Sequence, residues 1–200
     1  FASGTGSNFI SLYNQIEKGD INGEIILLIS NKPNCMAIDF AKDHNILTSV
    51  IPEDVISKGI KQQEFLLNKI RSVDADLIVL AGYLKMIPKE VILKYKNKIL
   101  NIHPSLLPKF GGKGYYGMKV HQAVIESKES FTGATVHFVN AKYDQGPILL
   151  QKKIQVHNDD ASSISKKVLK IEHEILPYTV KVFCDDRIYW KDNKPLIVGK

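Results

Sequence analysis

The amino-acid sequence predicts a single α/β domain with a Rossmann-like, open and mostly parallel twisted sheet that carries helices on both faces. Three observations support this class. Apolar strand segments alternate with amphipathic helical segments over about the first hundred residues, as in right-handed βαβ units. Residues 25–29 and 77–81 are continuous apolar runs, which is typical of strands buried on both faces. A glycine-rich turn, residues 4–6, stands directly before the first helical segment.

The remaining elements follow in order. Apolar residues three and four apart predict helices over residues 9–18, 35–44, 62–73, 88–95, 116–127 and 162–183. Strands are predicted over residues 24–30, 46–51, 76–83, 99–103, 133–140 and 147–156, and a short hairpin with Trp190 follows Asp185. A strand should also precede the first glycine-rich turn. Because only Phe1 and Ala2 stand there, we expect that a few further residues come before Phe1.

The composition and the distribution of charge indicate which classes of function are expected and which are not. Two hundred residues, 44% apolar and 24% charged, suit one soluble globular domain. The net charge of +6 comes from lysines spread along the chain, without a block of five like charges or a nucleic-acid-binding motif. We therefore expect no nucleic-acid partner. A basic surface suits anionic small molecules, although solubility alone explains these lysines equally well.

Compartment and membrane signals are also informative. No apolar run approaches the roughly 18 residues that a membrane span needs, and we expect no signal peptide. Cys35 and Cys184 lie far apart without metal-ligand spacing, so we expect two reduced thiols. These features predict a cytoplasmic protein with no membrane contact and no metal site.

Asn101 and His103 form the first candidate site. They lie two residues apart at the end of the apolar strand 99–103, so their side chains project from the same face. Pro104 and Pro108 end the strand. An amide donates hydrogen bonds without titrating, and an imidazole gains or loses a proton near neutral pH. Such a pair can stabilise an oxyanion and supply a proton to it, although an isolated Asn-x-His pair is more often structural.

The glycine-rich turn is a candidate anion site. Gly4 and Gly6 let the backbone approach a ligand, and the helix that follows directs free N–H groups at it. Ser7 and Asn8 add polar side chains. The dinucleotide-binding fingerprint is excluded because Phe9 stands where its third glycine belongs. The sequence pattern predicts either a phosphate site or a tight turn without a ligand.

Asp144 lies in a turn, Asp-Gln-Gly-Pro at residues 144–147, after the strand 133–140. A carboxylate in such a turn is most often a turn former. If Asp144 lies near His103, its charge should favour the imidazolium and raise the pKa of His103. Spacing alone does not place the two residues together.

The string Asn-Ile-His-Pro-Ser-Leu-Leu-Pro at residues 101–108 resembles the signature of the folate-dependent formyltransferases. The resemblance extends to about Trp190. It implies that a formyl group moves from 10-formyltetrahydrofolate to the amine of 5′-phosphoribosylglycinamide, in purine synthesis. The folate is then a co-substrate, and no cofactor is tightly bound. The resemblance also implies one domain over residues 1–200, whose first hundred residues bind the ribonucleotide and whose second half binds the folate, in a monomer or homodimer.

The same resemblance assigns site residues. In the catalytic set, protonated His103 acts as the acid, Asn101 helps to stabilise the oxyanion, and Asp144 keeps the imidazolium charged and relays protons. The ribonucleotide contacts are Gly6, Ser7, Asn8 and Glu172. The folate contacts are Leu84, Lys85, Met86, Ile87, Asn101, Asn140, Ala141, Lys142, Tyr143 and Asp144. His121 and His137 also match family positions, where a role in the core is equally expected.

One position departs from the family pattern. Relatives commonly carry a substrate-binding arginine before the helix that starts near Gln62, whereas residues 57–61 here contain none. Lys58 and Lys61 are the candidate replacements, but a lysine does not reproduce the bidentate fork of an arginine.

Three other functions stay open. Formyltetrahydrofolate deformylase uses the same folate with water as acceptor but usually carries an N-terminal regulatory domain. Methionyl-tRNA formyltransferase shares the core but normally adds a C-terminal RNA-binding domain. A nucleotide-binding regulatory module would bind phosphate ligands at Gly6 to Asn8 without any folate-dependent product.

Overall fold

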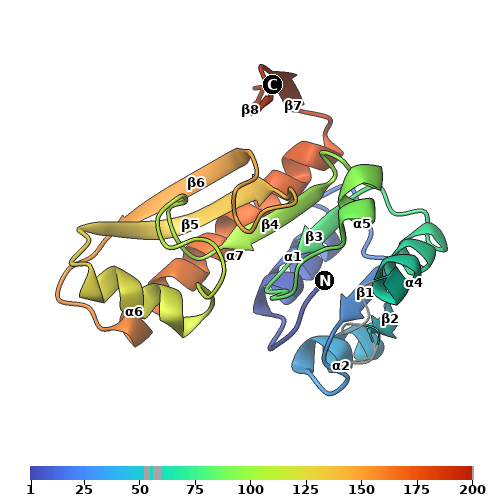
Figure 1. The fold of residues 1–200 in the computed structure, drawn as a ribbon, viewed down its shortest axis with the longest axis horizontal. Helices are drawn as coiled ribbons and strands as arrows, with labels where there is room; N and C mark the ends of the chain where they lie inside the picture. Colours follow the sequence, from blue (N-terminus) through green and yellow to red (C-terminus); the bar gives the residue numbers. More distant parts are fainter. Residues whose placement is uncertain (52–54, 56–59, 200) are drawn as a thin grey trace.

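The computed structural model describes residues 1–51, 55 and 60–199. The helices are α1 (Ser7–Glu17), α2 (Met36–Asp43), α4 (Ile60–Arg71), α5 (Lys89–Lys94), α6 (Met118–Glu126) and α7 (Ala161–Cys184). The strands are β1 (Leu27–Ser30), β2 (Leu47–Val50), β3 (Ile78–Leu80), β4 (Ile99–His103), β5 (Phe131–Phe138), β6 (Ile148–Gln155), β7 (Ile188–Lys191) and β8 (Lys194–Ile197) (Figure 1). Each of these elements lies where the sequence predicts one.

The sheet changes direction at β4. β1 pairs with β2, and β3 with β4, in parallel. β5 then runs antiparallel to β4, and β6 antiparallel to β5. Backbone bonds of the first two residues connect the two parallel pairs, because Ala2 donates to the Ile29 carbonyl (3.1 Å) and Ala81 donates to the Phe1 carbonyl (2.8 Å). The α/β class with its open twisted sheet is confirmed, with antiparallel strands added after β4.

Helices cover both faces of the sheet, as predicted. Neighbouring residues of β4 point to opposite faces, and Leu100 and Ile99 accordingly belong to two different core clusters. The Leu100 cluster contains buried residues of α1, α2, α6 and α7. The Ile99 cluster contains Leu66 of α4 and Val91 of α5. β4 is thereby buried on both sides, which explains its apolar sequence.

The long helix α7 packs against β5, β6, α1 and α6. It contains Pro177, which has no N–H to donate to the carbonyl of His173 one turn earlier. The side-chain hydroxyl of Ser11 in α1 donates to that carbonyl at 3.1 Å. In the part of the chain that the structure describes, neither α7 nor any other helix is long and apolar enough to cross a membrane.

We predict that Ser11→Ala lowers the free energy of unfolding by about 1 kcal/mol, because the His173 carbonyl then loses its only side-chain donor from α1. In a Pro177→Ala background the helix regains its own N–H, so Ser11→Ala should be nearly neutral there. Urea unfolding of the four proteins measures the coupling, and the cycle cancels the change in helix propensity. Equal effects of Ser11→Ala in both backgrounds would contradict this account.

Candidate active site

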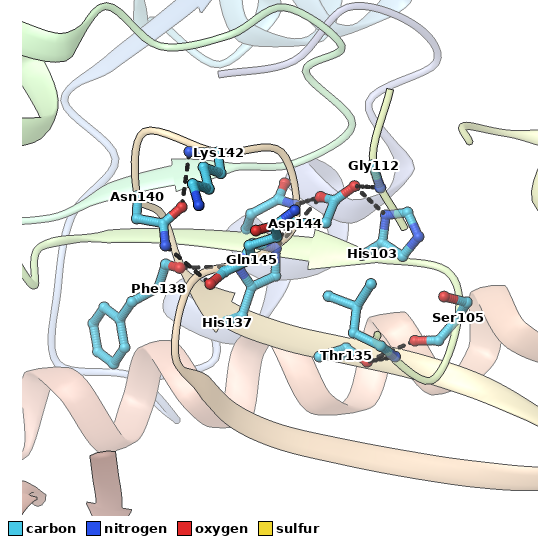
Figure 2. A network of polar contacts seen from close by, with 12 residues as sticks. His103, Ser105, Gly112, Thr135, His137, Phe138, Asn140, Lys142, Asp144 and Gln145 are labelled. Carbon is cyan, nitrogen blue, oxygen red and sulfur yellow. Dashed lines mark hydrogen bonds and ion pairs between the residues drawn. The ribbon is translucent and has the colours of Figure 1, made fainter. Parts of the chain in front are cut away.

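The loop after β4 fixes the end of the strand that carries Asn101 and His103. The buried hydroxyl of Thr135, on β5, donates to the Ser105 carbonyl at 2.6 Å and accepts the Leu107 N–H at 3.1 Å (Figure 2). Thr135 also pairs with His103 in the β4–β5 register. The turn that follows His103 is therefore tied to the next strand, which holds the imidazole in place.

Asp144 lies close to both residues. It has a left-handed backbone conformation (φ 52°), in a loop where a Cβ on Gly146 would lie 1.7 Å from the Phe138 carbonyl oxygen. Its Oδ2 accepts the Gly112 N–H at 2.8 Å and lies 3.6 Å from Nδ1 of His103 (Figure 2). The structure thus brings Asn101, His103 and Asp144 together.

A second histidine completes the network. Nδ1 of His137 donates to the Phe138 carbonyl (2.9 Å), so the other ring nitrogen, Nε2, is the one that can accept a hydrogen bond. The Asn101 amide nitrogen lies 3.0 Å from that Nε2 and 3.4 Å from Oδ1 of Asp144. One N–H of Asn101 is thus well bonded, whereas the other makes only a long contact and is free to turn to another acceptor.

The expected rise in the pKa of His103 is wrong in its net direction. Burial lowers the pKa of His103 and outweighs the nearby Asp144 charge, which acts in the expected upward direction. The ring is 4% exposed, and its Nε2 donates to the Phe110 carbonyl at 2.8 Å. At neutral pH the ring is therefore neutral, with the lone pair on the Nδ1 that faces Asp144.

The pKa of Asp144 moves the other way. Burial alone would raise it, but the contacts with His137, His103 and the Gly112 N–H together lower it below its ordinary value. A carboxylate is therefore present beside the neutral imidazole. Any proton that the His103 ring takes up creates an ion pair with a group that is already charged.

These groups line one cavity of about 460 Å³. Its walls come from the glycine-rich turn, the loops after β3 and β4, the glycine-rich segment 112–117, the Asp144 loop, α6 and α7. The site residues in contact with it are Gly6, Ser7, Asn8, Leu84, Asn101, His103, Tyr143, Asp144 and Glu172.

The glycine-rich turn is shaped as expected for an anion site. Gly6 has φ 75°, and a Cβ there would meet the Cβ of Ala37 at 2.8 Å. Helix α1 starts at the next residue with no side-chain cap, so its first N–H groups stay available. Beside it the Asn8 amide donates to Oε2 of the buried Glu172 at 2.6 Å. Burial raises the pKa of Glu172, and this hydrogen bond acts against the rise.

The other predicted folate contacts lie around the cavity rather than on its wall. Lys85 and Met86 are exposed, and Ile87 is buried in the core cluster of β3 and α5. Asn140 shapes the loop, since it donates to the Gln145 carbonyl (2.9 Å) and accepts the Lys142 N–H (2.9 Å) (Figure 2). Ala141 and Lys142 are exposed on the same loop. Of the candidate replacements for the family arginine, Lys61 is exposed on α4, and Lys58 lies outside the described residues.

The fold also places here three residues that the sequence did not single out, namely Gly112, Tyr115 and Ser165. It adds His121 and His137, which match family positions but had no predicted role in catalysis. The run of glycines at residues 111–117 was the available signal for Gly112 and Tyr115. Among residues 1–51, 55 and 60–199, no three His, Cys, Asp or Glu side chains come together in a way that could hold a metal ion.

Comparisons with known proteins agree with this geometry. A family model described as formyl transferase matches residues 1–180. A Vigna unguiculata protein named phosphoribosylglycinamide formyltransferase, chloroplastic, is 44% identical over 203 residues; the alignment covers all of this chain and 65% of that protein. A Haemophilus influenzae phosphoribosylglycinamide formyltransferase is 35% identical, with 99% of this chain and 92% of that protein covered. The crystal structure of glycinamide ribonucleotide transformylase 1 from Symbiobacterium toebii superposes with a TM-score of 0.91 at 27% identity, covering 99% and 92% of the two chains.

The buried histidines predict how stability depends on pH. Burial lowers the pKa of both His103 and His121, so the unfolded chain binds their protons more readily than the folded one. As the pH falls through about 6.5, the ordinary value for histidine, the free energy of unfolding should decrease, by at most about 1.4 kcal/mol per pH unit for each ring.

Urea unfolding between about pH 7.5 and pH 5.5 measures this slope. Glu172 acts with the opposite sign because its pKa is raised, so the informative comparison is with the double variant His103→Asn, His121→Gln. That variant should show a shallower slope. An equal or steeper slope in the variant rules out this explanation.

Proposed function

The chain belongs to the formyl transferase family, and on that premise we propose that it moves a formyl group from 10-formyltetrahydrofolate to the amine of 5′-phosphoribosylglycinamide. The products are formylglycinamide ribonucleotide and tetrahydrofolate, in purine synthesis. The folate is a co-substrate rather than a bound cofactor. Both substrates are small molecules.

One observation carries the proposal. A single cavity contains both an open helix N-terminus and a cluster of amide, imidazole and carboxylate. The helix N-terminus suits the ribonucleotide phosphate, and the cluster suits a carbonyl carbon that becomes tetrahedral. An enzyme that transfers the formyl group to water needs no phosphate site, so this pairing favours the ribonucleotide acceptor over hydrolysis.

Asn101, His103 and Asp144 each have a separate role in the transfer. The amine nitrogen bonds to the formyl carbon, and the carbonyl electron pair moves onto oxygen. The free N–H of Asn101 donates to that oxyanion. Nδ1 of the neutral His103 accepts the proton that the amine loses, and the Asp144 carboxylate stabilises the resulting imidazolium. When the carbon–nitrogen bond to the folate breaks, His103 returns the proton to the folate nitrogen.

The folate is proposed to bind beside Leu84, Tyr143 and Asp144, with Lys85, Met86 and Lys142 at the outer part of the site. Residues for each substrate come from both halves of the chain. A cytoplasmic location stays a prediction, since plant relatives are named chloroplastic.

An assay with formyl-labelled folate tests the function directly. Label should reach formylglycinamide ribonucleotide when the acceptor is present, and little formate should form without it. His103→Ala should lower the transfer rate by about 100- to 10,000-fold, as for the loss of a general acid–base group, while ribonucleotide binding persists. Substitution of the exposed His157 serves as the control. Release of labelled formate at the same rate with and without acceptor would assign a deformylase, and absence of any product would favour a binding module.

Asn8→Ala tests the ribonucleotide end of the cavity. The variant removes a polar side chain that lines this end of the cavity and frees Oε2 of Glu172, which Asn8 holds in place. The KM for the ribonucleotide should rise about tenfold, as for one lost hydrogen bond, with little change in the KM for the folate. Ser11→Ala, in the same helix but away from the cavity, is the matched control. A similar rise in both KM values contradicts the assignment of this end to the ribonucleotide.

A further inference from the structure

His121 lines the active-site cavity, yet the proposed reaction assigns it no task. Its side chain comes from α6 and is 4% exposed. Nδ1 is fully buried and has no hydrogen-bond partner among the described residues. Polar atoms buried in this way are rare in native proteins, so this one constrains which ring nitrogen carries the hydrogen.

The buried atom determines the form of the ring. An N–H at the sealed Nδ1 would lack an acceptor, which costs more than an unshared lone pair there. The neutral ring therefore carries its hydrogen on Nε2. Nε2 is not one of the sealed atoms, and it takes part in none of the side-chain hydrogen bonds found among the described residues. It is therefore the ring nitrogen that can face the cavity that His121 lines. His121 thus presents an uncharged N–H donor to that space. Burial, together with the nearby His103, lowers the pKa of His121 and keeps the ring neutral.

The adjoining wall, on α7, indicates which chemical group this donor meets. Helix α6 packs on α7, and Ser165, Leu169 and Glu172 follow each other on α7 at spacings of four and three, so they share one face and line the same cavity. Glu172 is a buried carboxyl group whose Oε2 already accepts from Asn8. A phosphate placed here would meet an acidic oxygen. A hydroxyl can accept from His121 and also donate to the carboxylate.

We propose that Nε2–H of His121 donates a hydrogen bond to the 2′- or 3′-hydroxyl of the ribose of the acceptor. The inference rests on the proposed function, because it specifies how the same cavity recognises its ribonucleotide. The phosphate then lies at the glycine-rich turn, the amine at Asn101 and His103, and the sugar between them against α6 and α7. His121 is a substrate-binding residue in this arrangement.

The test compares three substitutions by calorimetric titration with 5′-phosphoribosylglycinamide in the absence of folate. Glutamine places an amide N–H close to the position of Nε2, whereas asparagine reproduces the position of Nδ1 and leucine removes both. We expect His121→Leu and His121→Asn to raise the Kd about tenfold, as for the loss of one hydrogen bond, and His121→Gln to stay within about threefold of the native protein. Folate affinity should be unchanged throughout. If the leucine variant does not fold, the glutamine and asparagine pair still decides.

Sugar phosphates identify the contacted group. Ribose 5-phosphate should bind the native protein more tightly than its 2-deoxy or its 3-deoxy analogue, and His121→Leu should abolish that difference. Unchanged affinity in His121→Leu, equal effects of glutamine and asparagine, or a loss that is the same for ribose and both deoxy sugars would each overturn the inference. A native protein that binds neither the ribonucleotide nor ribose 5-phosphate would instead count against the proposed function itself.

Discussion

The carboxylate of Asp144 connects the separate parts of this site. One oxygen accepts the Gly112 N–H at 2.8 Å and lies 3.6 Å from His103, and the other lies near both Asn101 and His137. Two strands and two loops therefore converge on one charged group. Without it, two buried imidazoles and an amide would face each other with no negative charge to balance a proton. A positive φ at Asp144 and the close backbone approach at Gly146 are the local conformations that place the carboxylate there.

The change of strand direction at β4 makes this convergence possible. A parallel neighbour on one side, β3, delivers the Leu84 loop to the same end of the sheet as His103. An antiparallel neighbour on the other side, β5, places His137 directly beside Asn101. β5 ends beside the start of β4, where the Val139 N–H donates to the Ile99 carbonyl at 2.9 Å, and the loop that follows carries Asp144 to Asn101 and His103. The glycine-rich turn before α1 and the Glu172 face of α7 close the cavity from the remaining side.

Local pattern predicts much of this arrangement. Apolar runs and helical periodicity located the strands and helices, and the two-residue spacing predicted that Asn101 and His103 share a face. Pattern did not reveal that β5 and β6 run antiparallel, because β5 is buried along almost its whole length, as a parallel strand usually is. It also did not reveal the Asn8–Glu172 pair, whose members are 164 residues apart. The direction of the His103 pKa shift could not be predicted from the sequence, because it depends on how deeply the ring is buried. Burial lowers this pKa more than the Asp144 charge raises it. His121 and His137 matched family positions, but their roles depend on which ring nitrogens are left without partners.

The protonation of His103 depends on the balance between its burial and the Asp144 charge, and one experiment measures that balance. An NMR titration of the ring, in the native protein and in Asp144→Asn, reports the pKa of His103 directly. We expect a pKa below the ordinary histidine value of about 6.5 in the native protein, and a further decrease when the carboxylate becomes an amide. A native pKa at or above that value, or one that Asp144→Asn leaves unchanged, would contradict this expectation.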